Sequence, residues 1–218
     1  MKFRRYVLYC AAITALPAQW FAGGGGGVST LSADGQTRID SSITAISLYK
    51  PENGPSAHAF AGRHFNNYFS LQASYTWNRN ALSLTGSRLA NGVEATFQQN
   101  YRGRSSAAAG EGLVYFRPLS SRFRPYLSGG LGFVNFSAAA GAVTVSKGAV
   151  QLPPSAFQDT RPFWRTAVGI DIQIKRGYAF RYTFWETLSA NPISRQLIPA
   201  GARGLANFQS IFSVLKTF

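Results

Sequence analysis

The chain has 218 residues and carries 22 Lys and Arg against 8 Asp and Glu, a formal net charge of +14. The length suits a single domain, and no apolar run reaches the ~20 residues that a membrane-spanning helix needs. The basic surplus fits nucleic acid or a phosphate-bearing lipid surface as a partner. Because the arginines are scattered rather than clustered, the composition argues against nucleic acid.

The first 22 residues follow the charged, apolar, small-residue order of a secretory signal peptide. Its start carries three cations, Lys2, Arg4 and Arg5. Cleavage is expected after Ala18 or Ala22, which lowers the formal charge from +14 to +11 (14 − 3). The only cysteine, Cys10, leaves with this segment, so the mature chain would hold no disulfide. Export favours lipopolysaccharide phosphates over nucleic acid as the partner of the remaining cations.

Residues 23–37 follow, and the glycine run Gly23–Gly27 predicts a flexible linker. From residue 38 onwards, apolar and polar residues alternate, which is the period of a β-strand with one apolar and one polar face. The first strand is expected at about Arg38–Tyr49. Turn-forming residues at Lys50–Pro55 end it.

The clearest hairpin is predicted for Ser56–Phe65 and Tyr68–Asn80, joined by a two-residue Asn-Asn turn. The second arm alternates strictly between apolar and polar side chains. With a two-residue turn, Phe60 falls on the apolar face and Arg63 on the polar face.

Asn80–Ser106 is polar, and Asn91-Gly92 near its middle favours a second hairpin tip. Pairing outward from that tip sets Tyr75 opposite Ala108, and the apolar faces of the two arms then coincide. This stretch is therefore expected to form a long hairpin that stands clear of the apolar zone.

The later part of the chain predicts five further strands. They are Ala107–Arg117, Arg124–Phe136, Phe163–Ile174, Tyr178–Leu188 and Leu205–Phe218. Ser137–Thr160 and Asn191–Gly204 show no period and are expected to be surface loops. A three-residue turn at Lys175–Gly177, with a left-handed glycine, would set Asp171 directly across from Arg181.

Alternating strands joined in turn by short and long connections predict an all-β fold over residues 38–218, a closed antiparallel eight-stranded transmembrane β-barrel. Closure is required because strands that face lipid cannot leave backbone groups unpaired. A soluble β-sandwich is the alternative explanation of the alternation. Aromatic residues near strand ends, which are expected to face outward, favour the barrel. They are Tyr75, Trp77, Phe163 and Trp164 at the long-loop end, and Tyr115, Phe116, Tyr126, Tyr178, Phe180 and Phe218 at the short-turn end.

The last strand has apolar residues of one parity that run to the end of the chain, although Lys216 interrupts them. A terminal strand that closes on an aromatic residue resembles the β-signal read by the outer-membrane barrel assembly machinery. Its residues here are Phe212, Val214 and Phe218. With the strand Tyr-Phe-Ser-Leu-Gln-Ala-Ser-Tyr (68–75), residues 38–218 resemble the small eight-stranded outer-membrane proteins of the OmpA-type and OmpW-type barrel group. The resemblance implies a barrel-only protein of the Gram-negative outer membrane.

Five charged residues are predicted to project into the lumen, Arg63, Glu111, Arg165, Asp171 and Arg181. An eight-stranded barrel is just wide enough for side chains to fill, and buried charges there must be paired. Two hypotheses remain open: the charges plug the lumen, or they gate a narrow channel for ions or small apolar solutes.

The sequence predicts no catalytic residue, metal site or cofactor. His58 and His64 are the only histidines, and their spacing along one strand is too wide to chelate one metal directly. A lipid A-modifying enzyme with a Ser-His pair at the outer rim, using His58, is a third alternative, but no motif of such enzymes is present.

Basic residues near the outer strand ends are candidates for contact with lipopolysaccharide phosphates. They are Arg79, Arg102, Arg104 and Arg161. A solvated surface explains the same residues. The predicted function is a structural or surface-interaction role in the cell envelope. Its expected partners are membrane lipid, lipopolysaccharide and the assembly machinery, without nucleic acid, and the oligomeric state is open.

Overall fold

The computed structural model describes residues 19–32, 35–38, 45–51, 53–90, 93–145, 155–175, 177–191 and 204–218. These residues form ten β-strands: β1 Gln19–Ser32, β2 Gly35–Arg38, β3 Ala45–Pro51, β4 Asn53–His64, β5 Phe69–Ala90, β6 Val93–Tyr115, β7 Phe123–Val145, β8 Ala156–Lys175, β9 Tyr178–Ala190 and β10 Gly204–Thr217. Within the described ranges, no helix has the length and hydrophobicity to cross a membrane.

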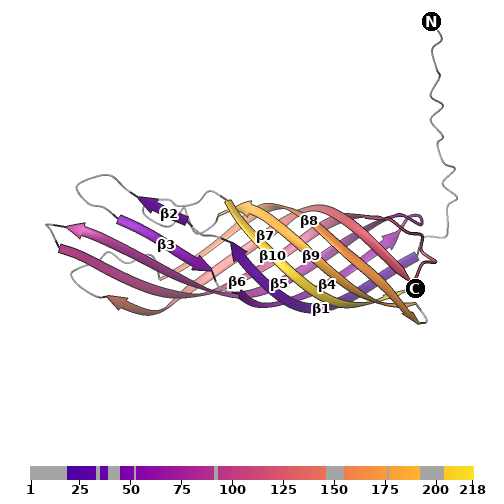
Figure 1. The fold of residues 1–218 in the computed structure, drawn as a ribbon, viewed down its shortest axis with the longest axis horizontal. Helices are drawn as coiled ribbons and strands as arrows, with labels where there is room; N and C mark the ends of the chain where they lie inside the picture. The colour runs from indigo at the N-terminus through magenta and orange to yellow at the C-terminus, as the bar shows by residue number, and fades with distance from the viewer. Residues whose placement is uncertain are drawn as a thin grey trace, which may run out of the picture.

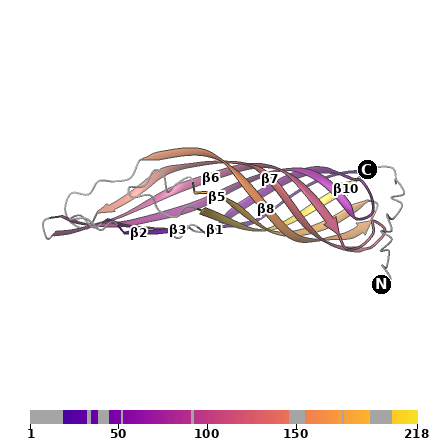
Figure 2. The same ribbon diagram turned by 90° about the horizontal axis from the view of Figure 1, so that it is seen from above.

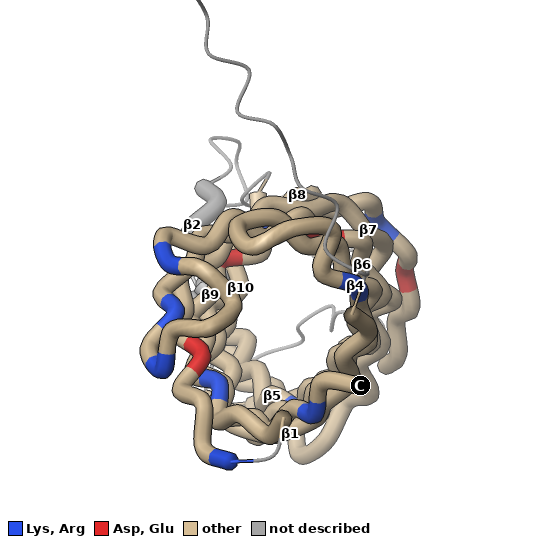
Figure 3. Tube along the Cα trace, turned by 90° about the vertical axis from the view of Figure 1, so that its right-hand side faces the viewer, with Lys and Arg blue, Asp and Glu red and all other residues tan. Residues whose placement is uncertain are grey.

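Eight of the strands close into a ring. The order is β5-β4-β1-β10-β9-β8-β7-β6, and pairing of β5 with β6 completes the circle. Every pairing is antiparallel, and the end view shows the ring (Figure 3). The predicted closed antiparallel barrel is confirmed, and the β-sandwich alternative is wrong.

The two remaining strands, β2 and β3, pair with each other and extend the barrel wall beyond the ends of β1 and β4. β3 pairs with β5 beyond the point where β4 stops, from Pro51↔Leu82 to Ala45↔Arg88. Between β4 and β3 the register against β5 shifts by one residue, from Ser56↔Asn78 to Pro51↔Leu82. β2 and β3 thus continue the hairpin of β1 and β4 (Figure 1).

The linker prediction for residues 23–37 is wrong, because Gly23–Gly27 lies inside the first barrel strand. In β1, Gly25 pairs with Ser213 on one side and His58 on the other. A run of glycine has no side chains that could show a period of two, so the sequence pattern could not reveal this strand. A Cβ atom at Gly25 or Gly27 would collide with backbone of β10, so close approach of the two strands requires glycine.

The barrel therefore begins at Gln19 instead of residue 38. The strand predicted at Arg38–Tyr49 is split between the end of β2 and the start of β3, and its residues 39–44 lie outside the described ranges. Residues 1–18, which hold most of the predicted signal peptide, also lie outside them.

The turn between β4 and β5 is longer than the predicted two residues. His64 pairs with Ser70, and the side-chain oxygen of Asn66 accepts hydrogen bonds from the backbone N–H groups of Tyr68 and Phe69, both at 2.8 Å. An Asn that caps its own turn in this way stabilises a wider loop. Because one extra residue exchanges the two faces of a strand, β4 is reversed relative to the prediction.

The long hairpin of β5 and β6 agrees with its predicted register. Tyr75 pairs with Ala108, and the ladder continues to Ala90↔Val93. Their 22 and 23 residues are about twice the 9–11 residues that a transmembrane strand needs. β7 and β8 are also long, so much of the predicted loop Ser137–Thr160 is strand, and only residues 146–154 fall outside the described ranges.

The short connections and the chain's C-terminus lie at one end of the barrel, here called the turn end. Its described connections include residues 65–68 and 116–122 and also Gly177, which has a φ of 79°. There the backbone N–H of Phe218 donates to the carbonyl of Trp20 at 2.8 Å, next to the start of β1. The long hairpins project from the opposite end (Figures 1 and 2).

The barrel has two parts with opposite side-chain distributions. In the barrel body, toward the turn end, apolar side chains such as Leu71, Val168 and Val214 face outward, while inward positions are largely polar. Residues 79–90, 93–104, 135–145 and 156–161 make up the extension, where the inward side chains are mostly apolar. Exposed aromatic residues ring the turn end: Trp20, Phe65, Tyr68, Phe116, Phe123, Tyr178 and Phe218. Tyr115, Tyr126 and Phe163, predicted to face outward, instead point inward and are buried.

Candidate functional site: the charged lumen

Four of the five predicted lumen charges lie inside the barrel body. Glu111 on β6, Arg165 and Asp171 on β8, and Arg181 on β9 are between 1% and 4% exposed. Arg63 is a correction, because the longer β4–β5 turn places it on the outside. Its guanidinium lies 5.6 Å from the ring centroids of both Trp20 and Phe65.

The first ion pair joins Glu111 to Arg165. The Arg165 Nη1 atom donates to Glu111 Oε1 at 2.8 Å, and Arg165 Nε donates to the hydroxyl of Thr187 at 3.0 Å. Glu111 Oε1 also accepts from the hydroxyl of Ser74 at 2.9 Å. A buried pair is stable only when its remaining hydrogen-bonding capacity is satisfied in this way.

The second ion pair is bidentate. Asp171 and Arg181 are cross-strand partners, and Arg181 Nε and Nη2 donate to the two carboxylate oxygens at 2.6 and 2.8 Å. The hydroxyl of Tyr115 donates to Asp171 Oδ2 at 2.9 Å. Parallel hydrogen bonds of this kind fix the relative orientation of the two side chains.

Gln72 on β5 connects the two ion pairs. Its side-chain oxygen accepts from Arg181 Nη1 at 2.9 Å, and its nitrogen donates to Glu111 Oε2 at 2.7 Å. The lumen charges therefore form one continuous network across the barrel. Sequence reasoning missed Gln72, although it lies on the polar face of the most regular predicted strand.

Aromatic rings cover both arginines. The Arg165 guanidinium lies 4.6 Å from the ring centroid of Trp185, and that of Arg181 lies 4.8 Å from the ring of Phe60. Ring faces attract cations more strongly where water is excluded. The rings and the ion pairs together fill this level of the lumen.

A third lumen cation, Arg124 on β7, was not predicted. It is the cross-strand neighbour of Asp171, and its guanidinium lies 3.8 Å from the ring centroid of Tyr115. Its Nη2 atom donates to the carbonyl of Asn67 at 3.3 Å. It stands beside a predicted turn, where a basic residue looks like an ordinary exposed side chain in the sequence.

Both histidines point into the lumen and are buried. His64 Nδ1 lies 2.6 Å from the hydroxyl of Ser70, and His58 packs 4.7 Å from Trp185 between ring centroids. His58 therefore does not lie at an outer rim, where the enzyme alternative placed it. In the described part of the chain, no three His, Cys, Asp or Glu side chains lie close enough together to hold a metal ion.

On the side of the charged network away from the turn end, an apolar cluster fills the interior of the extension and reaches the adjoining ends of β1 and β10. Its buried members are Leu31, Leu82, Leu84, Phe97, Tyr101, Phe136, Ala138, Phe157 and Leu205. Burial raises the pKa of Tyr101 to about 12, so its phenol stays protonated and donates to the side-chain oxygen of Gln99 at 2.9 Å. The cluster adds a second closure between the charged network and the ends of the long hairpins.

Three of the four candidate lipopolysaccharide contacts face outward. Arg79 and Arg104 are direct cross-strand partners, and Arg102 lies on the same exposed face of β6. Arg161 differs, because it lies on the inward parity of β8 and forms an ion pair with Asp159. The expectation that Arg161 faces the lipid headgroups is therefore corrected: its side chain pairs with Asp159 on the inward parity of β8.

Of the proposed assembly-signal residues, Phe212 and Val214 lie on the outward face of β10, and Phe218 follows its last residue. Phe212 and Val214 are about half exposed and Phe218 is 68% exposed. Lys216, which interrupts the apolar row, lies 5.5 and 5.1 Å from the rings of Tyr178 and Phe218. Its cation thus lies among the exposed aromatic side chains at the turn end instead of among the outward apolar side chains of the barrel body.

A family model described as the outer membrane protein beta-barrel domain matches residues 7–193. The chain belongs to this family. Its membership confirms the predicted resemblance to small eight-stranded outer-membrane barrels and indicates the bacterial outer membrane as its location. No curated protein sequence matches the chain.

Several solved outer-membrane barrels share the fold. Neisserial surface protein A is 11% identical with a TM-score of 0.58, covering 93% of this chain and 100% of that one. OprG from Pseudomonas aeruginosa is 9% identical with a TM-score of 0.51, covering 92% and 96%. Ail of Yersinia pestis, solved with the heparin analogue sucrose octasulfate, is 9% identical with a TM-score of 0.50, covering 93% and 100%. At these identities the likeness shows the fold alone.

Proposed function

We propose that this outer-membrane barrel is a non-conducting, non-enzymatic protein that presents its extension for interaction at the cell surface. The observation that carries the proposal is the double closure of the lumen. The network of Glu111, Arg165, Asp171 and Arg181 crosses the barrel body, and the apolar cluster fills the extension above it. An ion would have to break paired, buried charges and then enter an apolar zone, and both steps are costly.

Planar-bilayer recording of the refolded protein tests this closure. We expect no steady single-channel steps from the natural chain. Steps that disappear in Glu111→Ala or Asp171→Ala, but persist in the outward-facing control Glu186→Gln, would establish the narrow channel instead. The control removes a carboxylate from the outer face of β9 without touching the lumen.

The absence of an enzymatic role is supported by the position of His58. It packs against Trp185 and Phe60 inside the barrel, where a lipid A acyl chain could not reach it without displacing those rings. We expect the lipid A of cells that express the protein to be unchanged in mass. A modification abolished by His58→Ala would support the enzyme alternative.

Arg79, Arg102 and Arg104 are proposed to bind lipopolysaccharide phosphates. Two like charges directly opposite each other on adjacent strands destabilise a sheet unless an anion bridges them. Replacing Arg79 and Arg104 together by Ala should weaken binding to lipopolysaccharide about tenfold or more, since charge-assisted hydrogen bonds are lost. Replacing Arg117 and Arg122 at the turn end by Ala is the matched control. An equal loss in both variants would mean only a general charge effect.

Export and assembly are proposed to use the two ends of the chain. Cleavage after Ala18 would leave β1 whole, whereas cleavage after Ala22 would remove Phe21, which packs beside Phe60 and His64 inside the barrel. Mass spectrometry of the mature protein distinguishes the two sites. At the other end, Phe218→Ala should lower the fraction that shows heat-modifiable gel mobility in cells, and unchanged assembly would argue against recognition of Phe218.

A further inference from the structure

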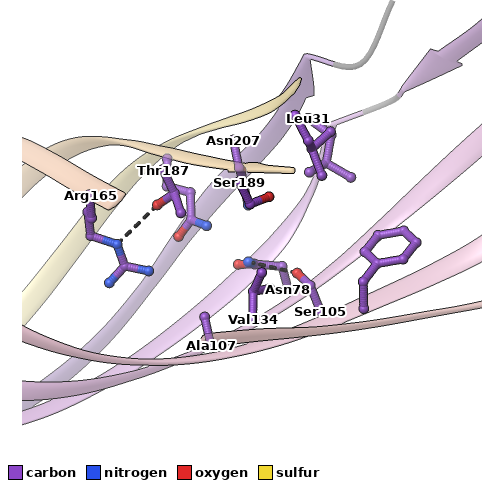
Figure 4. Close-up of a pocket in the computed structure, with 12 residues that line it drawn as sticks. Leu31, Asn78, Ser105, Ala107, Val134, Arg165, Thr187, Ser189 and Asn207 are labelled. Atoms are coloured by element: carbon purple, nitrogen blue, oxygen red, sulfur yellow. Dashed lines mark hydrogen bonds between the residues drawn. The ribbon is translucent and has the colours of Figure 1, made fainter. Parts of the chain in front are cut away.

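A cavity of ≈ 20 Å³ lies between the charged network and the apolar cluster. Arg165 and Thr187 border it on the side of the barrel body, and Leu31 borders it on the side of the extension (Figure 4). Asn78, Asn207 and Gln209 also line it. The space is sufficient for one or two water-sized particles, because a single water needs roughly 10–15 Å³ on this measure.

The polar groups left free around this cavity are hydrogen-bond donors. Arg165 uses Nε on Thr187 and Nη1 on Glu111, while Nη2 meets no acceptor among the described residues. The hydroxyl of Thr187 accepts from Arg165 at 3.0 Å, so its own hydrogen is free to donate.

The carboxamides of the cavity have their oxygens engaged elsewhere. The Asn207 oxygen accepts from the Ser29 hydroxyl at 2.8 Å. The Gln209 oxygen lies 3.3 Å from the Ser56 hydroxyl, whose single hydrogen is directed mainly to Asn78 at 2.5 Å, so this oxygen is engaged only in part. Within the described part of the chain, the amide nitrogens of Asn207 and Gln209 have no hydrogen-bond acceptor. Asn78 is satisfied at both ends, by Ser56 at 2.5 Å and Ser105 at 3.1 Å. The unused donors among the described residues of the cavity are therefore the amide nitrogens of Asn207 and Gln209, the Nη2 atom of Arg165 and the hydroxyl of Thr187.

The charge of the lumen favours an anion. In the barrel body, the buried cations are Arg124, Arg165 and Arg181, and the buried carboxylates are Glu111 and Asp171, which leaves a surplus of +1 (3 − 2) among the described residues. Glu111 balances Arg165, whereas Arg124 and Arg181 share Asp171, so the surplus belongs to the lumen as a whole. A cluster of donors beside a cationic guanidinium, in a medium of low dielectric constant, attracts an acceptor that carries negative charge.

We infer that this cavity is a binding site for a small monovalent anion of the size of a halide, nitrate or formate, held by Arg165 Nη2 and the amide nitrogens of Asn207 and Gln209. The apolar cluster closes the opposite side and keeps larger anions out. The site goes beyond the proposed surface role and does not depend on it, because a bound anion can sit in a barrel that does not conduct.

Anion-dependent stability is the first test. Sodium bromide replaces sodium gluconate at constant ionic strength, and the urea midpoint of unfolding is measured on the refolded protein in detergent. We expect a saturable rise in the midpoint with bromide, since a ligand that binds only the folded state stabilises it by mass action. Asn207→Asp, which places a carboxylate in the cavity, should abolish the rise. Asn135→Asp, the same change on the outer side of β7, should keep it.

Crystals of the natural chain grown in bromide give an independent readout that does not depend on the folding of a variant. An anomalous peak within hydrogen-bonding distance of Arg165 Nη2 and Asn207 Nδ2 would confirm the site. A cavity that contains only water at high bromide, or a midpoint that responds equally in Asn207→Asp, would overturn the inference. A conductance experiment reports on the proposed function separately.

Discussion

The barrel body and the extension are built on the same alternating backbone with opposite contents. Along β5, even-numbered residues from Ser70 to Gly86 face inward. They are polar at Ser70, Gln72 and Asn80 and become apolar at Leu82 and Leu84. Outward side chains change in the reverse sense, from exposed Leu71 and Tyr75 to exposed Arg79 and Ala81. The parity that faces inward thus stays the same along β5, while the medium around the strand changes.

This contrast shows that a period of two in the sequence identifies a strand but does not tell whether lipid or water surrounds it. A strand that faces lipid needs an apolar exterior and can carry a polar interior, because the lumen is sealed from the hydrocarbon. A strand that faces water follows the rule of soluble proteins and hides its apolar residues. The change occurs between Trp77 and Arg79, close to the aromatic residues expected at a membrane boundary.

The largest expected effect comes from breaking one ion pair of the barrel body. Arg181→Met leaves the Asp171 carboxylate buried without a counterion, and we expect the free energy of unfolding to fall by about 3–5 kcal/mol. Urea unfolding of the refolded protein in lipid vesicles measures this change. The double variant Asp171→Leu/Arg181→Met should recover most of the loss, since it removes both charges. A double variant as unstable as the single one would mean that packing, not charge pairing, stabilises this level.

Truncation of apolar side chains should affect the two parts differently. Leu84→Ala creates a cavity in the apolar cluster and should cost about 2–5 kcal/mol of the free energy of unfolding. Leu71→Ala removes a side chain that faces lipid, where acyl chains can fill the space, so we expect a loss of about 1 kcal/mol or less from the methylene transfer term. Equal losses in the two variants would contradict the assignment of different media.

Glycine substitutions test why β1 carries the run Gly23–Gly27 where it pairs with β10. At Gly27 an added Cβ would collide with the backbone of Ser210, so Gly27→Ala should destabilise the protein by about 1–3 kcal/mol through overpacking. At Gly110, in the lipid-facing part of β6, nothing lies within 4 Å of an added Cβ, and Gly110→Ala should be nearly neutral. The same urea experiment measures both, and a neutral Gly27→Ala would show that the spacing between β1 and β10 can widen freely.

The smallest expected effect concerns Tyr101 in the extension. At neutral pH, Tyr101→Phe removes one hydrogen bond to Gln99 and should cost about 0.5–1.5 kcal/mol. Because burial raises the pKa of Tyr101 from 10.0 to about 12, its protonated form is favoured in the folded state, so its contribution to stability is complete below pH 10 and declines from pH 10 to 12. The difference between the natural chain and Tyr101→Phe, measured across this range, isolates that decline. A difference that does not change with pH would place the phenol in contact with water.

Most strands of the barrel wall and four of the charged lumen residues could be predicted from the sequence, for identifiable reasons. Where both arms of a hairpin alternate and the turn length is fixed by its glycine, as in β8 and β9, the register that pairs Asp171 with Arg181 follows directly. Where side chains are missing, as at Gly23–Gly27, no pattern exists to be read. The reversed face of β4 came from one extra turn residue, which removed Arg63 from the lumen and brought His58 and Phe60 into it.

The network residues that sequence reasoning did not find share a different cause. Gln72 and Arg124 are direct cross-strand partners of Glu111 and Asp171 in neighbouring strands, whereas only closure of the ring brings Gln72 on β5 within hydrogen-bonding distance of Arg181 on β9. Uncharged amides and basic residues near turns carry no local signal of such a role. The cavity also depends on closure of the ring, because its lining residues come from β1 and from each of the strands β5 to β10.

The medium around the strands changes from lipid to water along β5 and β6. Spin labels at single cysteines introduced into the proposed mature chain, which lacks the segment that holds Cys10, the only cysteine of the sequence, test this change of medium most directly. Accessibility to oxygen and to a water-soluble nickel reagent is compared at Leu71, Tyr75, Ala81 and Asn100 in lipid vesicles. We expect oxygen to dominate at Leu71 and Tyr75 and the nickel reagent to dominate at Ala81 and Asn100. Labels at all four positions that respond alike to the two reagents would contradict this change of medium.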